Sequence, residues 1–127
     1  MLESKKYLQL QNINAYVISF QLSTLVWNIV LKWNYFNKTT VGTQYVRAAD
    51  SISANIAEGF GRFSKKDKIN FYRYSYGSVY ESKDWTEKAK TRKLLTPSEY
   101  IQIASLLNKI PLEIHGLIRF TNQKLAI

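Results

Sequence analysis

The sequence has 127 residues, 46% of them hydrophobic, with 18 lysines and arginines against nine acidic residues and a formal net charge of +9. This length fits one domain with its own core, and the hydrophobic content excludes a disordered basic tail. The absence of cysteine excludes disulfides, thiolate zinc sites and cysteine nucleophiles, and His115 is the only histidine. Because neither a membrane span nor a signal peptide is recognisable, we expect a cytoplasmic protein without a membrane partner.

The first half of the chain predicts two helices. Residues 12–36 carry two apolar stripes at helical spacing, which indicates a helix packed on two sides. A break is expected at 37–40, and a second helix at 40–58 follows. Gly59 and Gly61 are expected to end this helix by adopting a left-handed or open backbone.

The second half predicts two more helices. Ser64, with an acidic residue three positions later, is typical of a helix start, and a third helix is predicted over residues 65–91. Thr96 followed by Pro97 and Glu99 indicates the start of a fourth helix over residues 97–120.

Short connections make successive helices antiparallel neighbours. With no strand alternation and no internal repeat, the predicted fold is all-α, an antiparallel up-down-up-down four-helix bundle with residues 1–127 in one domain. In the fourth helix an apolar seam is formed by Tyr100, Ile103, Leu107, Ile110, Ile114 and Leu117. Pro111 lies inside this helix, where it predicts a kink.

A polar stripe runs along the small-residue second helix. Pairing the second and third helices across their short loop places Arg47 opposite 77–81, so Arg47 is predicted to pair with Glu81 in a partly buried site. Gly77 and Ser78 would let the two helices approach there. Six residues are interpreted as structural polar ties between helices: Arg47, Ser51, Asn55, Glu58, Ser78 and Glu81.

Residues 42–62, GTQYVRAADSISANIAEGFGR, resemble the pattern G-x-Q-x-x-R-A-x-x-S-I-x-x-N-I-A-E-G-x-G-R. This pattern is found in the bacterial four-helix-bundle family of the 23S rRNA intervening-sequence protein. The third helix resembles the F…GS…E pattern of the same family through Phe71, Gly77, Ser78 and Glu81. The resemblance extends over about residues 13–120.

The family resemblance implies an assembly and a class of partner. It implies a ring-like homopentamer of antiparallel four-helix bundles. The family is similar in fold to the accessory variability determinant of diversity-generating retroelements, which is associated with a reverse transcriptase and binds nucleic acid. Nucleic acid and a reverse transcriptase or other protein are therefore the partners that the resemblance suggests.

No catalytic, cofactor-binding or metal-binding constellation is recognisable. A di-iron bundle needs a Glu-x-x-His motif on each of two helices, whereas Glu113 and His115 have the wrong spacing to share a helix face. A lone histidine also supplies too few ligands for a catalytic zinc ion. Glu58 and Glu81 are expected several turns apart, which argues against a pair of catalytic carboxylates. We therefore expect a protein that is not an enzyme.

Ten basic residues and four acidic residues lie between positions 62 and 93. Such a segment is either a phosphate-contacting patch or a solvated helix face. The nine tyrosines of the chain could stack bases or fill subunit contacts. Candidate nucleic-acid contacts are Arg62, Lys65, Lys66, Lys68, Arg73, Lys88, Lys90, Arg92 and Lys93.

The sequence thus leads to two functional hypotheses. In the first, the chain is a homo-oligomeric bundle that binds RNA or DNA through a basic surface with low sequence specificity. In the second, it is a protein-binding adaptor or scaffold whose positive charge serves solubility alone.

Overall fold

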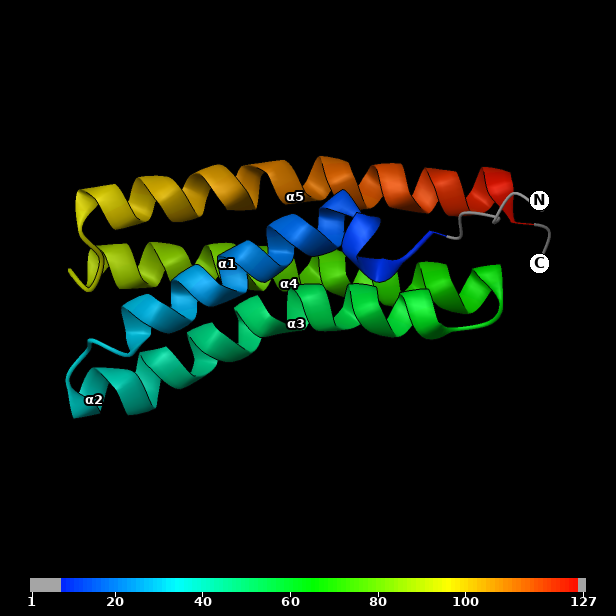
Figure 1. The fold of residues 1–127 in the computed structure, drawn as a ribbon. Helices are drawn as coiled ribbons and strands as arrows, with labels where there is room; N and C mark the ends of the chain where they lie inside the picture. The colour runs from blue at the N-terminus through cyan, green and yellow to red at the C-terminus, as the bar shows by residue number, and fades with distance from the viewer. Residues whose placement is uncertain (1–7, 126–127) are drawn as a thin grey trace, which may run out of the picture.

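The computed structural model describes residues 8–125, and within that range it contains helices and no strand. Residues 1–7 and 126–127 of the predicted domain lie outside this range. Four long helices form the bundle, which confirms the predicted fold class (Figure 1). The elements in chain order are η1 (Leu10–Asn12), α1 (Asn14–Val30), α2 (Tyr35–Asn37), the π-helical turn η2 (Lys38–Gly42), α3 (Thr43–Gly61), α4 (Lys65–Thr91) and α5 (Pro97–Lys124).

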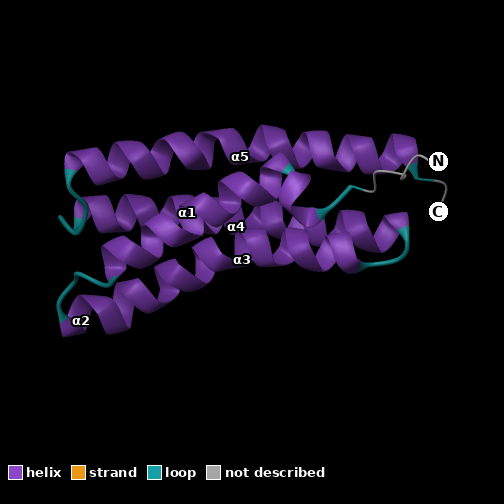
Figure 2. Ribbon diagram, in the orientation of Figure 1, coloured by secondary structure: helices purple, strands orange, loops and turns teal. Residues whose placement is uncertain are grey.

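The long helices lie side by side, and loops join them alternately at the two ends of the bundle (Figure 2). Both α1 and α4 pack against α3 and α5, so the four helices surround one core. At one end, which we call the Arg62 end, α3 stops, α4 starts and α5 stops. At the opposite end, the Lys93 end, α1 and α4 stop and α5 starts.

All four long helices contribute to the core. Most of the apolar seam predicted in the fourth helix is buried in α5. Five of its six side chains are no more than 9% exposed, whereas Tyr100, at the start of the helix, is half-buried. The other helices face this seam with large side chains that are almost completely buried: Leu22 and Val26 from α1, Tyr45, Ile52 and Ile56 from α3, and Tyr72 and Val79 from α4.

The first interhelical break lies earlier than predicted. Helix α1 stops at Val30, and a turn at 31–34 replaces the expected break at 37–40. The physical reason is Asn34, whose side chain accepts a hydrogen bond of 2.9 Å from the backbone N–H of Asn37 and starts a new helix. From Tyr35 the chain stays helical through η2 into α3.

The glycines at the end of α3 do not act as predicted. No described glycine has a positive φ, and α3 continues through Gly61 before Arg62 adopts an extended backbone. Gly59 instead allows a close helix contact. A Cβ atom at Gly59 would lie 2.7 Å from Cε1 of Tyr72 and 2.9 Å from the carbonyl oxygen of Lys68.

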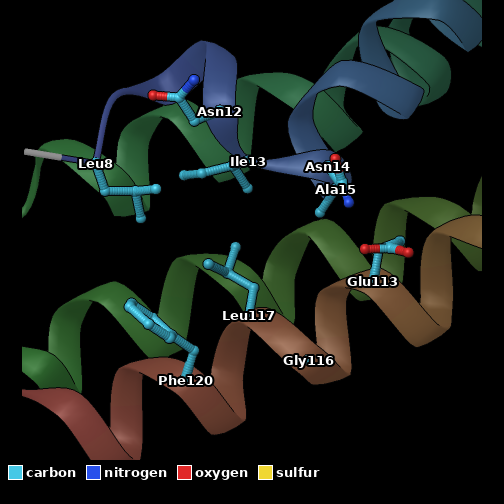
Figure 3. Close-up of a pocket in the computed structure, with 9 residues that line it drawn as sticks. All are labelled: Leu8, Asn12, Ile13, Asn14, Ala15, Glu113, Gly116, Leu117 and Phe120. Carbon is cyan, nitrogen blue, oxygen red and sulfur yellow. The ribbon is translucent and has the colours of Figure 1, made fainter. Parts of the chain in front are cut away.

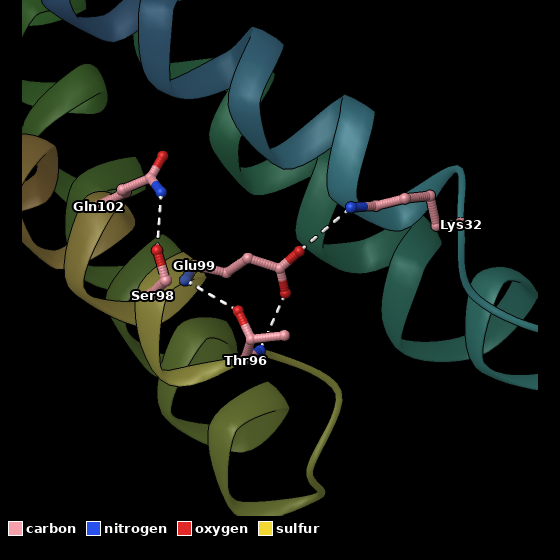
Figure 4. Close-up of polar contacts among 5 residues, drawn as sticks. All are labelled: Lys32, Thr96, Ser98, Glu99 and Gln102. Atoms are coloured by element: carbon pink, nitrogen blue, oxygen red, sulfur yellow. Dashed lines mark hydrogen bonds and ion pairs between the residues drawn. The ribbon is translucent and has the colours of Figure 1, made fainter.

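The start of α5 has the predicted capping arrangement (Figure 4). The Thr96 hydroxyl accepts a hydrogen bond of 3.0 Å from the Glu99 backbone N–H, and a Glu99 carboxylate oxygen accepts one of 2.9 Å from the Thr96 N–H. The hydrogen bond from the Thr96 N–H lowers the pKa of Glu99, and the positive charge of Lys32 lowers it further. Lys32 Nζ, beyond the end of α1, lies 3.3 Å from the same carboxylate. Helix α5 then runs through Pro111 without a break.

The contact at Gly59 predicts an asymmetry between glycine substitutions. Gly59→Ala should lower the free energy of unfolding by about 1–3 kcal/mol, because the new methyl group overpacks the contact with Tyr72. Gly116→Ala is the matched control, since a Cβ there meets no atom within 4 Å. It should leave stability unchanged or raise it by up to about 1 kcal/mol through helix propensity. Denaturant unfolding of both variants measures the difference, and equal stabilities would contradict the close contact.

Burial of Tyr72 predicts a loss of stability in alkali. Burial raises the pKa of Tyr72 to about 12 from an ordinary value of 10.0, although the polar side chain of Thr121 lowers the pKa by a smaller amount. Because the pKa is higher in the folded state, this contribution to stability is complete below about pH 10 and is lost as the pH rises towards about 12. Melting temperatures across this range should therefore fall less for Tyr72→Phe than for the unaltered protein. Parallel curves would show that Tyr72 ionises as freely in the folded state as in the unfolded chain.

Candidate nucleic-acid interface

The predicted basic residues form two groups rather than one patch. Helix α4 has 27 residues and is therefore about 40 Å long. This length separates the residues near its start from those near its end, so that one chain presents two distinct basic regions. The group at the Arg62 end comprises Arg62, Lys65, Lys66, Lys68 and Arg73, and the group at the Lys93 end comprises Lys88, Lys90, Arg92 and Lys93.

At the Lys93 end, acidic residues lie among the cations. Lys88 Nζ lies 2.6 Å from a carboxylate oxygen of Asp84. Lys90 Nζ lies 4.2 Å from the centre of the Tyr100 ring, whose hydroxyl donates a hydrogen bond to Glu87. Lys32 likewise pairs with Glu99 in this region. Arg92 and Lys93, by contrast, are exposed and form no ion pair within residues 8–125.

At the Arg62 end, the positive charge is in excess. The C-terminal part of α5 lies beside the start of α4, since Lys65 Nζ donates a hydrogen bond of 3.3 Å to the Asn122 carbonyl oxygen. Exposed Arg119 and Lys124 belong to this part of α5 and add two further cations.

Two of the cations at this end are committed to holding the fold. The Arg62 side chain forms an ion pair of 3.2 Å with Glu58, and its guanidinium lies 4.6 Å from the centre of the Phe71 ring. Lys68 Nζ donates a hydrogen bond of 2.7 Å to the Phe60 carbonyl oxygen, and burial lowers its pKa. Both side chains therefore fasten the connection between α3 and α4.

Lys66 and Arg73 are the cations of this group that remain available. Both are exposed, and within residues 8–125 neither forms an ion pair. They lie two helical turns apart on α4, about 10 Å along its axis. Both line a shallow hollow of about 340 Å³. The other residues that line the hollow are Lys65, Ile69, Asn70 and Asn122.

Phe63 is a further candidate that was absent from the sequence-based list. It is 83% exposed in the turn between α3 and α4. Helical periodicity could not reveal it, because it lies outside the helices. The available signal was an apolar aromatic side chain flanked by Arg62 on one side and by Lys65 and Lys66 on the other.

The predicted pair between Arg47 and Glu81 does not form within the chain. Both residues are exposed, and no ion pair in the described part of the chain involves either of them. The predicted close approach at Gly77 is also missing, since a Cβ there meets no atom within 4 Å. Among the other predicted ties, Ser78 is half-buried and forms no hydrogen bond through its side chain within residues 8–125.

The remaining predicted ties bond within α3 or to its end. The Ser51 hydroxyl donates to the Arg47 carbonyl oxygen at 2.7 Å, and the Asn55 amide donates to the Ser51 carbonyl oxygen at 2.9 Å. Glu58 pairs with Arg62, four residues later, at the end of α3. Ser and Asn side chains in helices commonly hydrogen-bond to the carbonyl oxygen four residues earlier, as Ser51 and Asn55 do here. Their positions in the sequence could not show whether they would bond within the helix or to a neighbouring helix.

The remaining polar groups do not assemble into a catalytic or metal-binding site in the described part of the chain. A hollow of about 300 Å³ between η1 and α5 contains Glu113 as its only acidic side chain (Figure 3). His115 is exposed, and its ring centre lies 5.0 Å from that of Tyr76. Within residues 8–125, no three His, Cys, Asp or Glu side chains gather where they could hold a metal ion. None of the described helices is long and apolar enough to cross a membrane.

Comparisons with known proteins agree with the resemblance seen in residues 42–62. A protein-family model described as 23S rRNA-intervening sequence protein matches residues 11–116, which confirms the predicted family. The chain is similar to a crystal structure, at 1.70 Å resolution, of a protein with unknown function from the S23 ribosomal protein family of Bacteroides thetaiotaomicron. The two share 21% sequence identity and a TM-score of 0.73 over 82% of this chain and 97% of that chain, which supports the fold. No curated protein matches the sequence.

Proposed function

The chain belongs to the 23S rRNA-intervening sequence protein family, and we propose that it is a non-enzymatic, homo-oligomeric bundle that binds RNA or DNA through its Arg62 end. The observation that carries this proposal is the positive charge of Lys66 and Arg73, which form no ion pair within residues 8–125 and lie beside a hollow that Lys65 also lines. Phosphates of one strand follow one another at intervals of a few ångströms, so two cations about 10 Å apart can contact the same backbone.

The expected binding is electrostatic and depends little on sequence. Contacts between basic side chains and phosphates give affinity and position, whereas specificity needs contacts to base edges. A net charge of +9 adds long-range attraction for a polyanion. The absence of catalytic activity is part of the proposal. The ring of His115, the only histidine in the sequence, lies beside that of Tyr76 and forms no ion pair within residues 8–125.

The self-association that we propose uses a different surface. Phe20 and Trp27 of α1, and Leu31 directly after its end, are each at least half exposed. Trp27 and Leu31 also border a largely apolar groove of about 300 Å³ between α1 and the start of α3, which Val46 lines from the other side. Covering such a surface with another copy of the chain removes apolar area from water. The homopentamer implied by the family resemblance is the assembly that we propose.

The alternative function is that of an adaptor or scaffold with no role in nucleic-acid binding. The same apolar groove favours it, because another protein, such as a reverse transcriptase, could take the place of a second copy. The two functions differ in whether the intact assembly binds nucleic acid at low salt.

Binding by Lys66 and Arg73 predicts a specific effect of neutralising them. The double variant Lys66→Gln with Arg73→Gln should bind RNA and DNA oligonucleotides more weakly, and its affinity should depend less steeply on salt because about two phosphate contacts are lost. The matched control is Lys109→Gln with Lys83→Gln, which removes the same charge from residues outside both basic groups. Fluorescence anisotropy between about 50 and about 300 mM salt measures both effects.

Three results of this titration would be decisive. If only the first double variant loses affinity, the Arg62 end is the binding surface. An equal loss in both variants would mean that net charge, and not this surface, determines binding. If the intact assembly shows no affinity at low salt, the adaptor function replaces the proposed one.

The proposed assembly surface makes a second prediction. Leu31→Asp should lower the mass of the assembly in light scattering while helix content stays unchanged, because it places a charge in an apolar contact. Leu112→Asp is the control, since Leu112 is exposed on α5 outside the groove. A monomeric unaltered protein would contradict the homo-oligomer, and an unchanged mass for Leu31→Asp would exclude this face from the assembly.

A further inference from the structure

The turn between α3 and α4 is held in place on both sides of Phe63. Before it, Arg62 is fixed by Glu58 and by the Phe71 ring. After it, the Ser64 hydroxyl accepts a hydrogen bond of 3.1 Å from the backbone N–H of Asp67 and starts α4. Lys68 adds a hydrogen bond across the turn to the Phe60 carbonyl oxygen. The backbone that carries Phe63 is therefore ordered by contacts that do not involve the Phe63 ring.

The ring itself contributes little to the fold. At 83% exposed, Phe63 leaves most of its apolar surface in water and lies outside the hydrophobic core. An exposed aromatic ring on an ordered turn loses little conformational freedom when a flat ligand covers it. The Phe63 ring is therefore suited to stacking against a planar ligand.

The surroundings of Phe63 point to the chemistry of that ligand. One residue separates Phe63 from Lys65 and two separate it from Lys66, and both lysines line the basic hollow. The side-chain amide of Asn70, also at the hollow, offers a donor and an acceptor. Proteins bind single-stranded nucleic acid by placing positive charges along the phosphate backbone and aromatic side chains where the bases can stack on them.

From this arrangement we propose that the Arg62 end binds single-stranded nucleic acid, with an unpaired base stacked on Phe63 and the adjoining phosphates held by Lys66 and Arg73. This inference rests on the proposed nucleic-acid function and adds that the bound nucleic acid is single-stranded. A base inside a duplex is already stacked on both faces, so it reaches a protein ring only at an end or after leaving the helix. The turn would therefore favour unpaired bases over a continuous duplex.

The test compares two exposed aromatic residues. Phe63→Leu removes the stacking face but keeps an apolar side chain, and Tyr35→Leu is the matched control because Tyr35 is also 83% exposed but lies towards the Lys93 end. The probes are a mixed-sequence single strand of about 15 nucleotides and the duplex formed with its complement. Anisotropy gives affinities, and 2-aminopurine placed in the single strand reports stacking through the quenching of its fluorescence.

We expect the single strand to bind more tightly than the duplex. Phe63→Leu should weaken single-strand binding about tenfold and remove the quenching, whereas duplex binding should change little. Phe63→Trp should preserve both affinity and quenching, and Tyr35→Leu should behave like the unaltered protein.

Failure of this inference differs from failure of the proposed function. If Lys66→Gln with Arg73→Gln weakens binding but Phe63→Leu does not, the basic surface stands and base stacking on Phe63 is overturned. Equal affinity for single strand and duplex overturns it in the same way. A change in oligomer mass caused by Phe63→Leu would place the ring in a subunit contact. If neither probe binds at low salt, the proposed function itself fails.

Discussion

The contact between α3 and α4 determines where the candidate site lies. It is fixed at three heights along the bundle. Near the Arg62 end, Gly59 lets the Tyr72 ring pack directly on the α3 backbone. Midway, the buried Ser75 hydroxyl donates a hydrogen bond of 2.7 Å to the Ile52 carbonyl oxygen, and further along the Tyr45 and Thr86 hydroxyls lie 2.7 Å apart. Because buried hydroxyls are costly to leave unpaired, these bonds restrict the sliding of one helix along the other. The turn that carries Phe63 is consequently held in one position.

This contact also explains why the cations at the Arg62 end play different roles. Arg62 and Lys68 lie next to the turn, where partners from the fold are close to their charged groups. Arg62 pairs with Glu58 and lies over the Phe71 ring, and Lys68 donates a hydrogen bond to the Phe60 carbonyl oxygen. Lys66 and Arg73 are exposed on α4, and neither forms an ion pair with another residue of the range 8–125. A count of charges along the sequence treats these four residues alike. Among the described residues, Arg62 and Lys68 have partners in the fold, whereas Lys66 and Arg73 have no acidic partner. Neutralising Arg62 or Lys68 would therefore disturb the fold as well as the surface.

The sequence could predict the fold because several local signals agree. The apolar seam of α5, the capping residues Ser64 and Thr96, and the short turns all indicate one bundle. The predicted pairing of Arg47 with Glu81 failed for a geometric reason. Adding residue numbers across a hairpin gives the height of a residue along its partner helix but not the direction of its side chain around the helix axis. Arg47 and Glu81 both point outwards, while Ser75 and Ile52 face the contact. Phe63 was missed because a single exposed residue in a turn has no periodicity.

Assembly would change what the Arg62 end can do. In a closed cyclic assembly all copies are related by rotation about one axis, so their Arg62 ends would form a single ring. Each copy alone offers one aromatic ring and a few free cations, which suits a weak contact with a short stretch of strand. Several such contacts on one continuous strand would reinforce each other, since binding at one site raises the effective concentration of the strand at the next. The excess charge on each chain and the apolar stripe on α1 would then act together. The stripe would gather the subunits, and the gathered basic ends would hold a strand that no single subunit could retain.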